Sequence, residues 1–84
     1  MNEKVSIIIR TKNEERWIFN CLKKILNQSY KNIEIVIVDN YSTDKTLKKI
    51  KNFPHKVIKI KKFLPGKALN LGIEKASGSI IVCL

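Results

Sequence analysis

The chain has 84 residues, of which 44% are hydrophobic and 29% charged, and its formal net charge at pH 7 is +10. This length allows one small domain, and the apolar content excludes a disordered chain. No run approaches the roughly 18 apolar residues of a membrane-spanning helix, and we expect a protein of the cytoplasm or of the cytoplasmic face of a membrane. The excess of lysine leaves three kinds of partner open: nucleic acid, an anionic membrane surface and phosphate-bearing ligands.

Lysine is densest between residues 45 and 62. A nucleic-acid site would be better supported by aromatic residues between the basic ones, because bases stack on such rings. Only Phe53 and Phe63 flank the run, and both fit a packing role. A solvated surface is therefore the plainer interpretation of this charge, and a patch with a binding function is the alternative.

Short apolar runs alternate with segments of helical periodicity along the whole chain. Runs rich in β-branched residues predict strands at 5–9, 33–38, 57–60 and 79–84. Apolar residues at helical spacing predict helices at about 14–28, 43–53 and 67–76. Strands that alternate with helices in this way form a parallel sheet with right-handed crossovers. We therefore predict a three-layer α/β/α fold, Rossmann-like, with about four parallel strands in the order 3-2-1-4.

Side chains of the capping type stand before two of the predicted helices. Thr11 and Glu14 have the spacing of a capping box, and Asn13 is an alternative N-cap. Ser42 or Thr43 can cap the next helix. These residues predict where the first two helices begin.

Polar residues also gather where a ligand would bind. In an open parallel sheet, ligands bind beyond the carboxyl ends of the strands, where the strand order reverses. Asp39 directly follows the second predicted strand, and its carboxylate could accept a hydrogen bond from a base or a ribose hydroxyl. Aspartate is also common in turns and caps, so both interpretations of Asp39 stay open. Thr11 and Glu14 lie at the same edge and could serve either the helix end or a ligand.

The third predicted helix starts with a cation and carries small residues on one side. Lys67 lies at its N-terminus, where the helix dipole disfavours a positive charge. A phosphate-facing lysine and a solvated lysine are both compatible with this position. Ala68, Gly72 and Ala76 recur one turn apart, which would allow the helix to approach the sheet closely.

Four ordered segments carry a resemblance to a known family and cover nearly all of the chain. They are 5–15 (VSIIIRTKNEE), 21–30 (CLKKILNQSY), 35–46 (IVIVDNYSTDKT) and 65–78 (PGKALNLGIEKASG). These segments resemble the family 2 glycosyltransferases of the GT-A fold, which transfer a sugar from a nucleotide diphosphate to an acceptor hydroxyl. The resemblance implies that residues 1–84 form a single partial domain, the N-terminal nucleotide-sugar-binding part of such an enzyme.

The resemblance also implies roles for individual residues. Thr11, Asn13 and Glu14 would belong to the pocket for a nucleotide sugar, such as a UDP or GDP sugar. Asp39 would bond the base, and Lys67 would lie near the nucleotide.

Three residues depart from the pattern of that family. Arg10 and Lys12 stand where the family commonly has proline and tyrosine. Asn40 replaces a second carboxylate that often follows the residue at position 39. These departures leave base stacking and the identity of the nucleotide open.

The catalytic parts of the family fall outside these motifs. Its Asp-x-Asp metal motif and its general base would follow Leu84, so we predict no catalytic and no metal-binding residue in the chain. A divalent cation, Mg²⁺ or Mn²⁺, is expected for the full-length parent and is not expected on this chain's own residues. We expect the chain alone not to transfer sugar. The expected acceptor of the parent is a glycan or a lipid-linked sugar, in the synthesis of a cell-surface polysaccharide or glycan.

Further partners follow from the surface. The apolar fourth strand predicts self-association, and the basic charge predicts peripheral contact with a membrane, whereas a nucleic-acid partner is not expected. The alternative function is a non-catalytic α/β binding module whose basic face meets an acidic partner or a membrane surface. A nucleic-acid-binding domain is the third possible function.

Overall fold

The computed structural model describes residues 3–60 and 65–84, without the side chains of residues 65–69. Seven elements alternate between strand and helix. They are β1 (Val5–Thr11), α1 (Ile18–Leu26), β2 (Ile33–Asp39), α2 (Thr46–Ile50), β3 (Lys56–Lys59), α3 (Pro65–Lys75) and β4 (Ile80–Cys83). The four strands of this described part form one sheet in the order β3-β2-β1-β4, and every neighbouring pair is parallel. The predicted fold class and strand order are confirmed.

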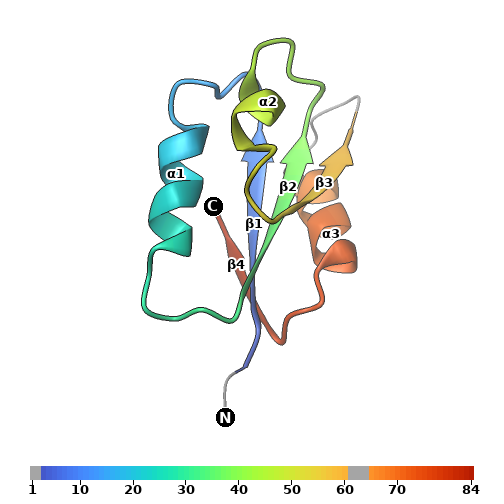
Figure 1. The fold of residues 1–84 in the computed structure, drawn as a ribbon. Coiled ribbons are helices and arrows are strands. Elements are labelled where there is room, and N and C mark those ends of the chain that lie inside the picture. Colours follow the sequence, from blue (N-terminus) through green and yellow to red (C-terminus); the bar gives the residue numbers. More distant parts are fainter. Residues whose placement is uncertain (1–2, 61–64) are drawn as a thin grey trace.

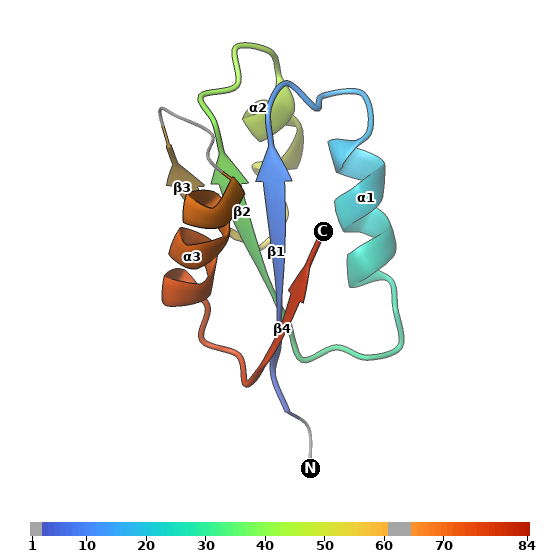
Figure 2. The ribbon, with the colours of Figure 1, turned by 180° about the vertical axis from the view of Figure 1, so that it is seen from behind.

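The helices cover the sheet from both sides, which gives three layers. Helices α1 and α2 lie on one face, and α3 lies on the other, as the two opposite views in Figures 1 and 2 show. All four strands run in the same direction, so their carboxyl ends lie at one edge of the sheet. This edge is where the loops 12–17 and 40–45 leave β1 and β2.

The core consists of two clusters because successive strand residues point to opposite faces. On the face of α1 and α2, the buried residues are Ile7, Ile9, Ile18, Leu22, Ile25, Ile35, Ile37 and Ile50. On the face of α3, they are Ile8, Val36, Val38 and Ile60. The two central strands are apolar on both faces, as is typical of parallel strands between helix layers.

The predicted starts of the first two helices are wrong. Helix α1 begins only at Ile18 and has no side-chain cap, because Thr11 extends β1 instead of capping a helix. Helix α2 begins at Thr46 rather than after Ser42 or Thr43. The Oδ1 atom of Asp44 accepts a hydrogen bond from the backbone nitrogen of Thr46 at 2.9 Å. This bond satisfies one of the backbone N–H groups that have no partner within the helix.

Helix α3 approaches β1 closely at Gly72, as the small residues of this helix predicted. A Cβ atom at position 72 would lie 2.6 Å from Cγ2 of Ile8, which is itself buried in the core. Real Cβ atoms essentially never approach another heavy atom so closely. Glycine is therefore required here by the close packing of helix and sheet rather than by a backbone angle.

Gly72→Ala is expected to lower the free energy of unfolding by about 1–2 kcal/mol. The destabilisation from overpacking against Ile8 is larger than the stabilisation from the higher helix propensity of alanine. Urea unfolding would measure the change. Asn70→Ala, at an exposed position of the same helix, is the control and should change stability little. A Gly72→Ala chain as stable as the wild type would contradict the close packing.

Strand β4 is an edge strand with uncovered apolar side chains. Among the described strands it pairs with β1 alone, and the exposed fractions of Ile80, Ile81 and Val82 are 42%, 37% and 39%. Unpaired edges with apolar side chains favour association with another chain. The self-association expected from the sequence stays a prediction.

Candidate nucleotide-binding site

Thr11 and Asp39 meet at the carboxyl edge of the sheet. They are register partners on the neighbouring strands β1 and β2, and both side chains are buried. The hydroxyl of Thr11 donates a hydrogen bond to Oδ1 of Asp39 at 2.5 Å. The sequence placed both residues at this edge, and the parallel register explains why they are in contact.

Ser42, in the loop that follows β2, donates two hydrogen bonds to the carboxylate of Asp39. Its backbone nitrogen donates to Oδ2 at 2.9 Å, and its hydroxyl donates to Oδ1 at 2.6 Å. The side chain of Asp39 thus receives three hydrogen bonds, and the residue is 0% exposed. In this structure the carboxylate holds the loop, so a ligand could reach it only after Ser42 moves.

Asn13 fastens the loop after β1 to the loop after β2. Its side-chain oxygen accepts hydrogen bonds from the backbone nitrogens of Thr43 at 2.7 Å and Asp44 at 3.3 Å. Its own backbone nitrogen donates to the hydroxyl of Ser42 at 2.9 Å. Asn13 adopts a left-handed φ of 55°, which asparagine tolerates better than most residues. Asn13 therefore links the two loops through both its side chain and its backbone.

A second set of bonds ties the loop before α1 to the beginning of α2 and to the residue Asp44 that precedes it. The backbone nitrogen of Glu14 donates to Oγ1 of Thr46 at 2.7 Å, and that of Glu15 donates to Oδ2 of Asp44 at 3.2 Å. Desolvation alone would raise the pKa of Asp44, but hydrogen bonds from Thr46 and Glu15 outweigh it and lower that pKa. An ionised Asp44 thus favours the observed arrangement of both loops.

A hollow of about 300 Å³ lies beside these loops, between the ends of β1 and β4. It is lined by Arg10, Thr11, Lys12, Glu14, Trp17 and Leu84. Strand β4 lies on the opposite side of β1 from β2 and β3, so the strand order reverses between β1 and β4. The hollow is therefore at the topological switch point, where open α/β sheets bind their ligands.

Trp17 is the aromatic side chain of this hollow. It is 42% exposed, and its indole nitrogen donates to Oε1 of Glu14 at 2.7 Å. Glu14 thus fixes the ring at the wall of the hollow. In the sequence, Trp17 is one of the apolar residues at helical spacing in the predicted helix 14–28, and this spacing does not give its orientation, which depends on how the loop 12–17 folds.

Only some of the five residues predicted to bind a nucleotide sugar line the hollow. Thr11 and Glu14 line the hollow, whereas Asp39 and Asn13 do not. Lys67 lies in the first turn of α3, and its side chain is outside the described residues. Arg10 and Lys12 line the hollow and were noted in the sequence only as departures from a family pattern. Their position at the end of β1 was the signal that could have identified them.

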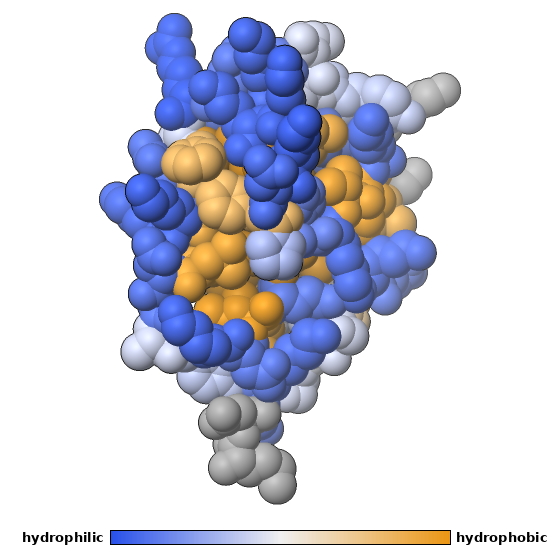
Figure 3. Space-filling view, viewed as in Figure 1, coloured by the Kyte–Doolittle hydropathy of each residue, from blue (hydrophilic) through white to orange (hydrophobic). Residues whose placement is uncertain are grey.

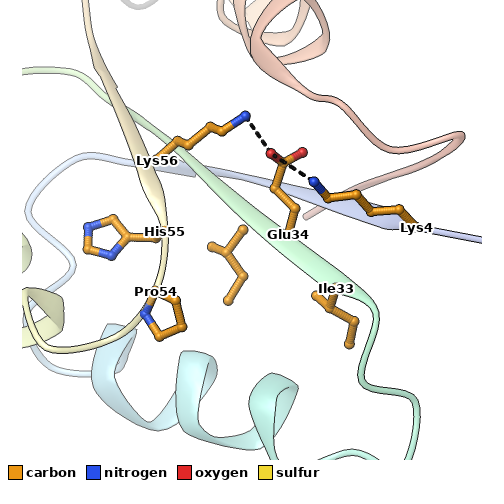
Figure 4. A pocket seen from close by; sticks show the side chains of 7 residues that line it. Lys4, Ile33, Glu34, Pro54, His55 and Lys56 are labelled. Carbon is orange, nitrogen blue, oxygen red and sulfur yellow. Dashed lines mark ion pairs between the residues drawn. The ribbon is translucent and has the colours of Figure 1, made fainter.

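A different hollow, at the amino edge of the sheet, contains a buried carboxylate. Glu34 is 9% exposed, and one of its oxygens pairs with Nζ of Lys56 at 2.6 Å and Nζ of Lys4 at 3.8 Å (Figure 4). Its other oxygen accepts from the hydroxyl of Ser6 at 2.6 Å and from the backbone nitrogen of Ser77 at 2.8 Å. These bonds join β1, β2, β3 and the connection from α3 to β4.

The pKa of Glu34 reflects this surrounding. Burial alone would raise it, but the hydrogen bonds from Lys56, Ser6 and Ser77 outweigh burial and lower the pKa from 4.5 to about 2. The carboxylate is therefore ionised at neutral pH. All its partners belong to the chain itself, so we interpret this cluster as a structural one.

Two further features bear on function. Among residues 3–60 and 65–84, no group of three histidine, cysteine, aspartate or glutamate side chains is placed to hold a metal ion. In the same part of the chain, no helix has the length and apolar character needed to cross a membrane.

An open parallel sheet with polar loops and a hollow at its switch point is a Rossmann-like α/β architecture. The family model described as Glycosyl transferase family 2 matches residues 6–84. The chain therefore belongs to the family 2 glycosyltransferases.

Individual relatives agree with this assignment. A glycosyltransferase of Methanococcus voltae, named as a dolichyl N-acetyl-alpha-D-glucosaminyl phosphate 3-beta-D-2,3-diacetamido-2,3-dideoxy-beta-D-glucuronosyltransferase, is 42% identical over 87 residues, which cover 93% of this chain and 27% of the relative. An uncharacterized glycosyltransferase of Haemophilus influenzae is 38% identical over 86 residues, which cover 95% of this chain and 34% of the relative. The chain thus spans about a third or less of the length of these relatives.

Two solved structures share the fold. The mannosyltransferase PcManGT from Pyrobaculum calidifontis, in complex with GDP-Man and Mn²⁺, has a TM-score of 0.85 and 26% identity. TarS of S. aureus, in complex with UDP-GlcNAc, has a TM-score of 0.83 and 31% identity. Each match covers 96% of this chain and 26% of the other. These matches confirm the GT-A architecture of the described part.

Proposed function

We propose that this chain is the nucleotide-sugar-binding part of a glycosyltransferase and that the donor lies in the hollow between β1 and β4. The observation that carries the proposal is the position of Arg10 and Lys12, two cationic residues on a hollow at the switch point of the sheet. Cationic side chains at such a place attract the diphosphate of a donor. The nucleotide sugars bound to PcManGT and TarS support this class of ligand.

Asp39 is the proposed partner of the base. A carboxylate can accept the imide N–H of a pyrimidine, but here its oxygens are occupied by Thr11 and Ser42. We therefore propose that the incoming base replaces Ser42 at Asp39. Between these two residues, Tyr41 adopts a left-handed φ of 45°, a conformation that costs a bulky residue about 1–2 kcal/mol. Release of this strain would favour the rearrangement of the loop.

The other predicted residues take supporting parts in this proposal. Glu14 holds the ring of Trp17 against the hollow, and Asn13 holds the loop that carries Ser42. Lys67, at the start of α3, is proposed to face a phosphate group of the nucleotide.

The parent enzyme is proposed to transfer the sugar to a hydroxyl of a glycan or lipid-linked acceptor. That reaction needs a base for the acceptor hydroxyl and a charge to neutralise the leaving diphosphate, which a divalent cation such as Mg²⁺ or Mn²⁺ supplies when bound. The sequence contains no Asp-x-Asp motif. We propose that residues 1–84 form a partial domain that binds the donor and does not transfer it.

A titration of the chain with UDP, GDP and CMP sugars is expected to perturb a small set of amide NMR signals. The shifts should be confined to the loops near Thr11 and Asp39 and to the start of α3 near Lys67, because these surround the switch point. The nucleotide with the largest shifts identifies the base. Uniform small shifts, or shifts at the amino edge around Glu34, would contradict the proposed site.

Ser42→Ala tests the proposed exchange at Asp39. Removing the hydroxyl takes one hydrogen bond from the carboxylate and leaves it more accessible to the base. Nucleotide affinity should stay equal or rise by a few fold. A large loss of affinity would show that Ser42 assists binding and would contradict the exchange.

A further inference from the structure

We propose that the outer face of α1 and α2 docks on an anionic membrane surface. The term helix face denotes residues 18–32 and 45–53, which comprise both helices, the segments that follow them and Lys45, the residue directly before α2. This proposal goes beyond donor binding and does not depend on it. The helix face lies along the sheet, whereas the donor hollow lies at the carboxyl edge, so both surfaces can be occupied together (Figure 1).

The charge of the helix face is entirely positive. Its basic residues are Lys23, Lys24, Lys31, Lys45, Lys48, Lys49 and Lys51. The same two segments contain no aspartate and no glutamate, so they contribute +7 of the formal net charge of +10. Anionic membranes attract such clusters, and each lysine near the surface contributes to binding.

None of these lysines forms an ion pair with another described residue. Both ion pairs among the described residues involve Glu34, at the amino edge of the sheet, with Lys4 and Lys56 as partners. Neither lysine belongs to the helix face. Its positive charges therefore remain available to an external partner with negative charge.

A pair of aromatic rings lies within this basic surface. Phe19 of α1 is 42% exposed, and its ring packs on Phe53, with 5.2 Å between centroids and 54° between planes. Figure 3 looks onto this side of the molecule and shows an apolar area surrounded by hydrophilic residues. Apolar rings among lysines match the boundary between headgroups and acyl chains of a bilayer.

The arrangement of the rings favours a membrane over nucleic acid. Binding of single strands uses separate aromatic faces on which successive bases stack. Here Phe19 and Phe53 pack on one another, so their faces are partly used. An apolar edge that enters the headgroup layer does not need free ring faces.

Sedimentation with vesicles tests the proposal. Wild-type chain should sediment with vesicles of phosphatidylglycerol and phosphatidylcholine in equal parts and not with vesicles of phosphatidylcholine alone. Lys48→Gln with Lys49→Gln should lower the partition coefficient on the order of tenfold. The matched control, Lys59→Gln with Lys75→Gln, removes the same charge from exposed positions outside the helix face and should change it by less than about threefold.

A second pair of variants tests the rings. Phe19→Ser should weaken vesicle binding several fold, whereas Ile73→Ser, at a comparably exposed apolar position of α3, should not. Circular dichroism would confirm that each variant is folded. No binding to the anionic vesicles, equal losses for the two lysine pairs, or stronger binding to single-stranded DNA than to vesicles would overturn the proposal. The nucleotide titration on the same variants reports donor binding separately.

Discussion

Glu34→Ala is expected to lower the free energy of unfolding by about 3 kcal/mol at neutral pH. The change removes the carboxylate that accepts hydrogen bonds from the hydroxyl of Ser6 and the backbone nitrogen of Ser77 at the amino edge of the sheet. Lys56, whose side chain is 51% exposed, can turn to water and accounts for less of the loss. Urea unfolding at neutral pH would measure the difference. Glu74→Ala, which removes the same charge from an exposed position of α3, is the control and should be nearly neutral.

The effect of Glu34 should fade in acid. Its pKa in the folded chain is about 2, below the ordinary 4.5, so the folded state favours the ionised form. The resulting stability is present above about pH 4.5 and is lost as the pH falls toward 2. At pH 3 the wild type should have lost about 2 kcal/mol through this group, whereas Glu34→Gln should lack this part of the loss. Equal acid sensitivity of the two chains would contradict the assignment.

Asp39→Asn is expected to weaken nucleotide binding by about tenfold to a hundredfold. The amide keeps the shape of the side chain but loses the negative charge that we propose to accept the base N–H. The NMR titration, or calorimetry with the preferred nucleotide, would measure the loss.

Asp44→Asn is the matched control for Asp39. Asp44 also accepts hydrogen bonds from backbone nitrogens, those of Thr46 at the start of α2 and of Glu15 in the loop after β1, but has no proposed contact with the base. Its replacement should weaken the loop and change nucleotide affinity by no more than a few fold. If Asp39→Asn binds as the wild type does, or if both variants lose affinity equally, Asp39 serves the loop alone.

The strands could be predicted from the sequence because their signal is local. The β-branched runs of β1 and β2 have no competing interpretation, and their alternation with helices determines the parallel arrangement. The starts of α1 and α2 were mispredicted because capping residues also serve other partners. Thr11 matches a capping box, yet its hydroxyl bonds Asp39, 28 positions away. No local pattern contains such a contact.

The candidate site was predictable only in part for the same reason. Thr11 and Asp39 lie at the same edge of the sheet, as the ends of their strands predicted. The hydrogen bonds from Ser42 to the carboxylate depend on the backbone of an irregular loop. In the sequence, Glu34 is the one charged residue of the predicted strand 33–38, and nothing local identifies its partners. Its partners Lys56 and Ser77 are distant in the sequence, and only the complete fold brings them next to Glu34.

The connection from α3 to β4 has a consequence for how the chain folds. Of the four strands described, β1 is synthesised first and its neighbour β4 last. The hydrogen bond from Gly78 to Ser6 joins residues 72 positions apart. One edge of β1 must therefore stay unpaired on the ribosome until nearly all of this segment has emerged, and such long-range pairing is slow. The late arrival of β4 makes the interval before it docks the period in which the nascent chain is most exposed to aggregation.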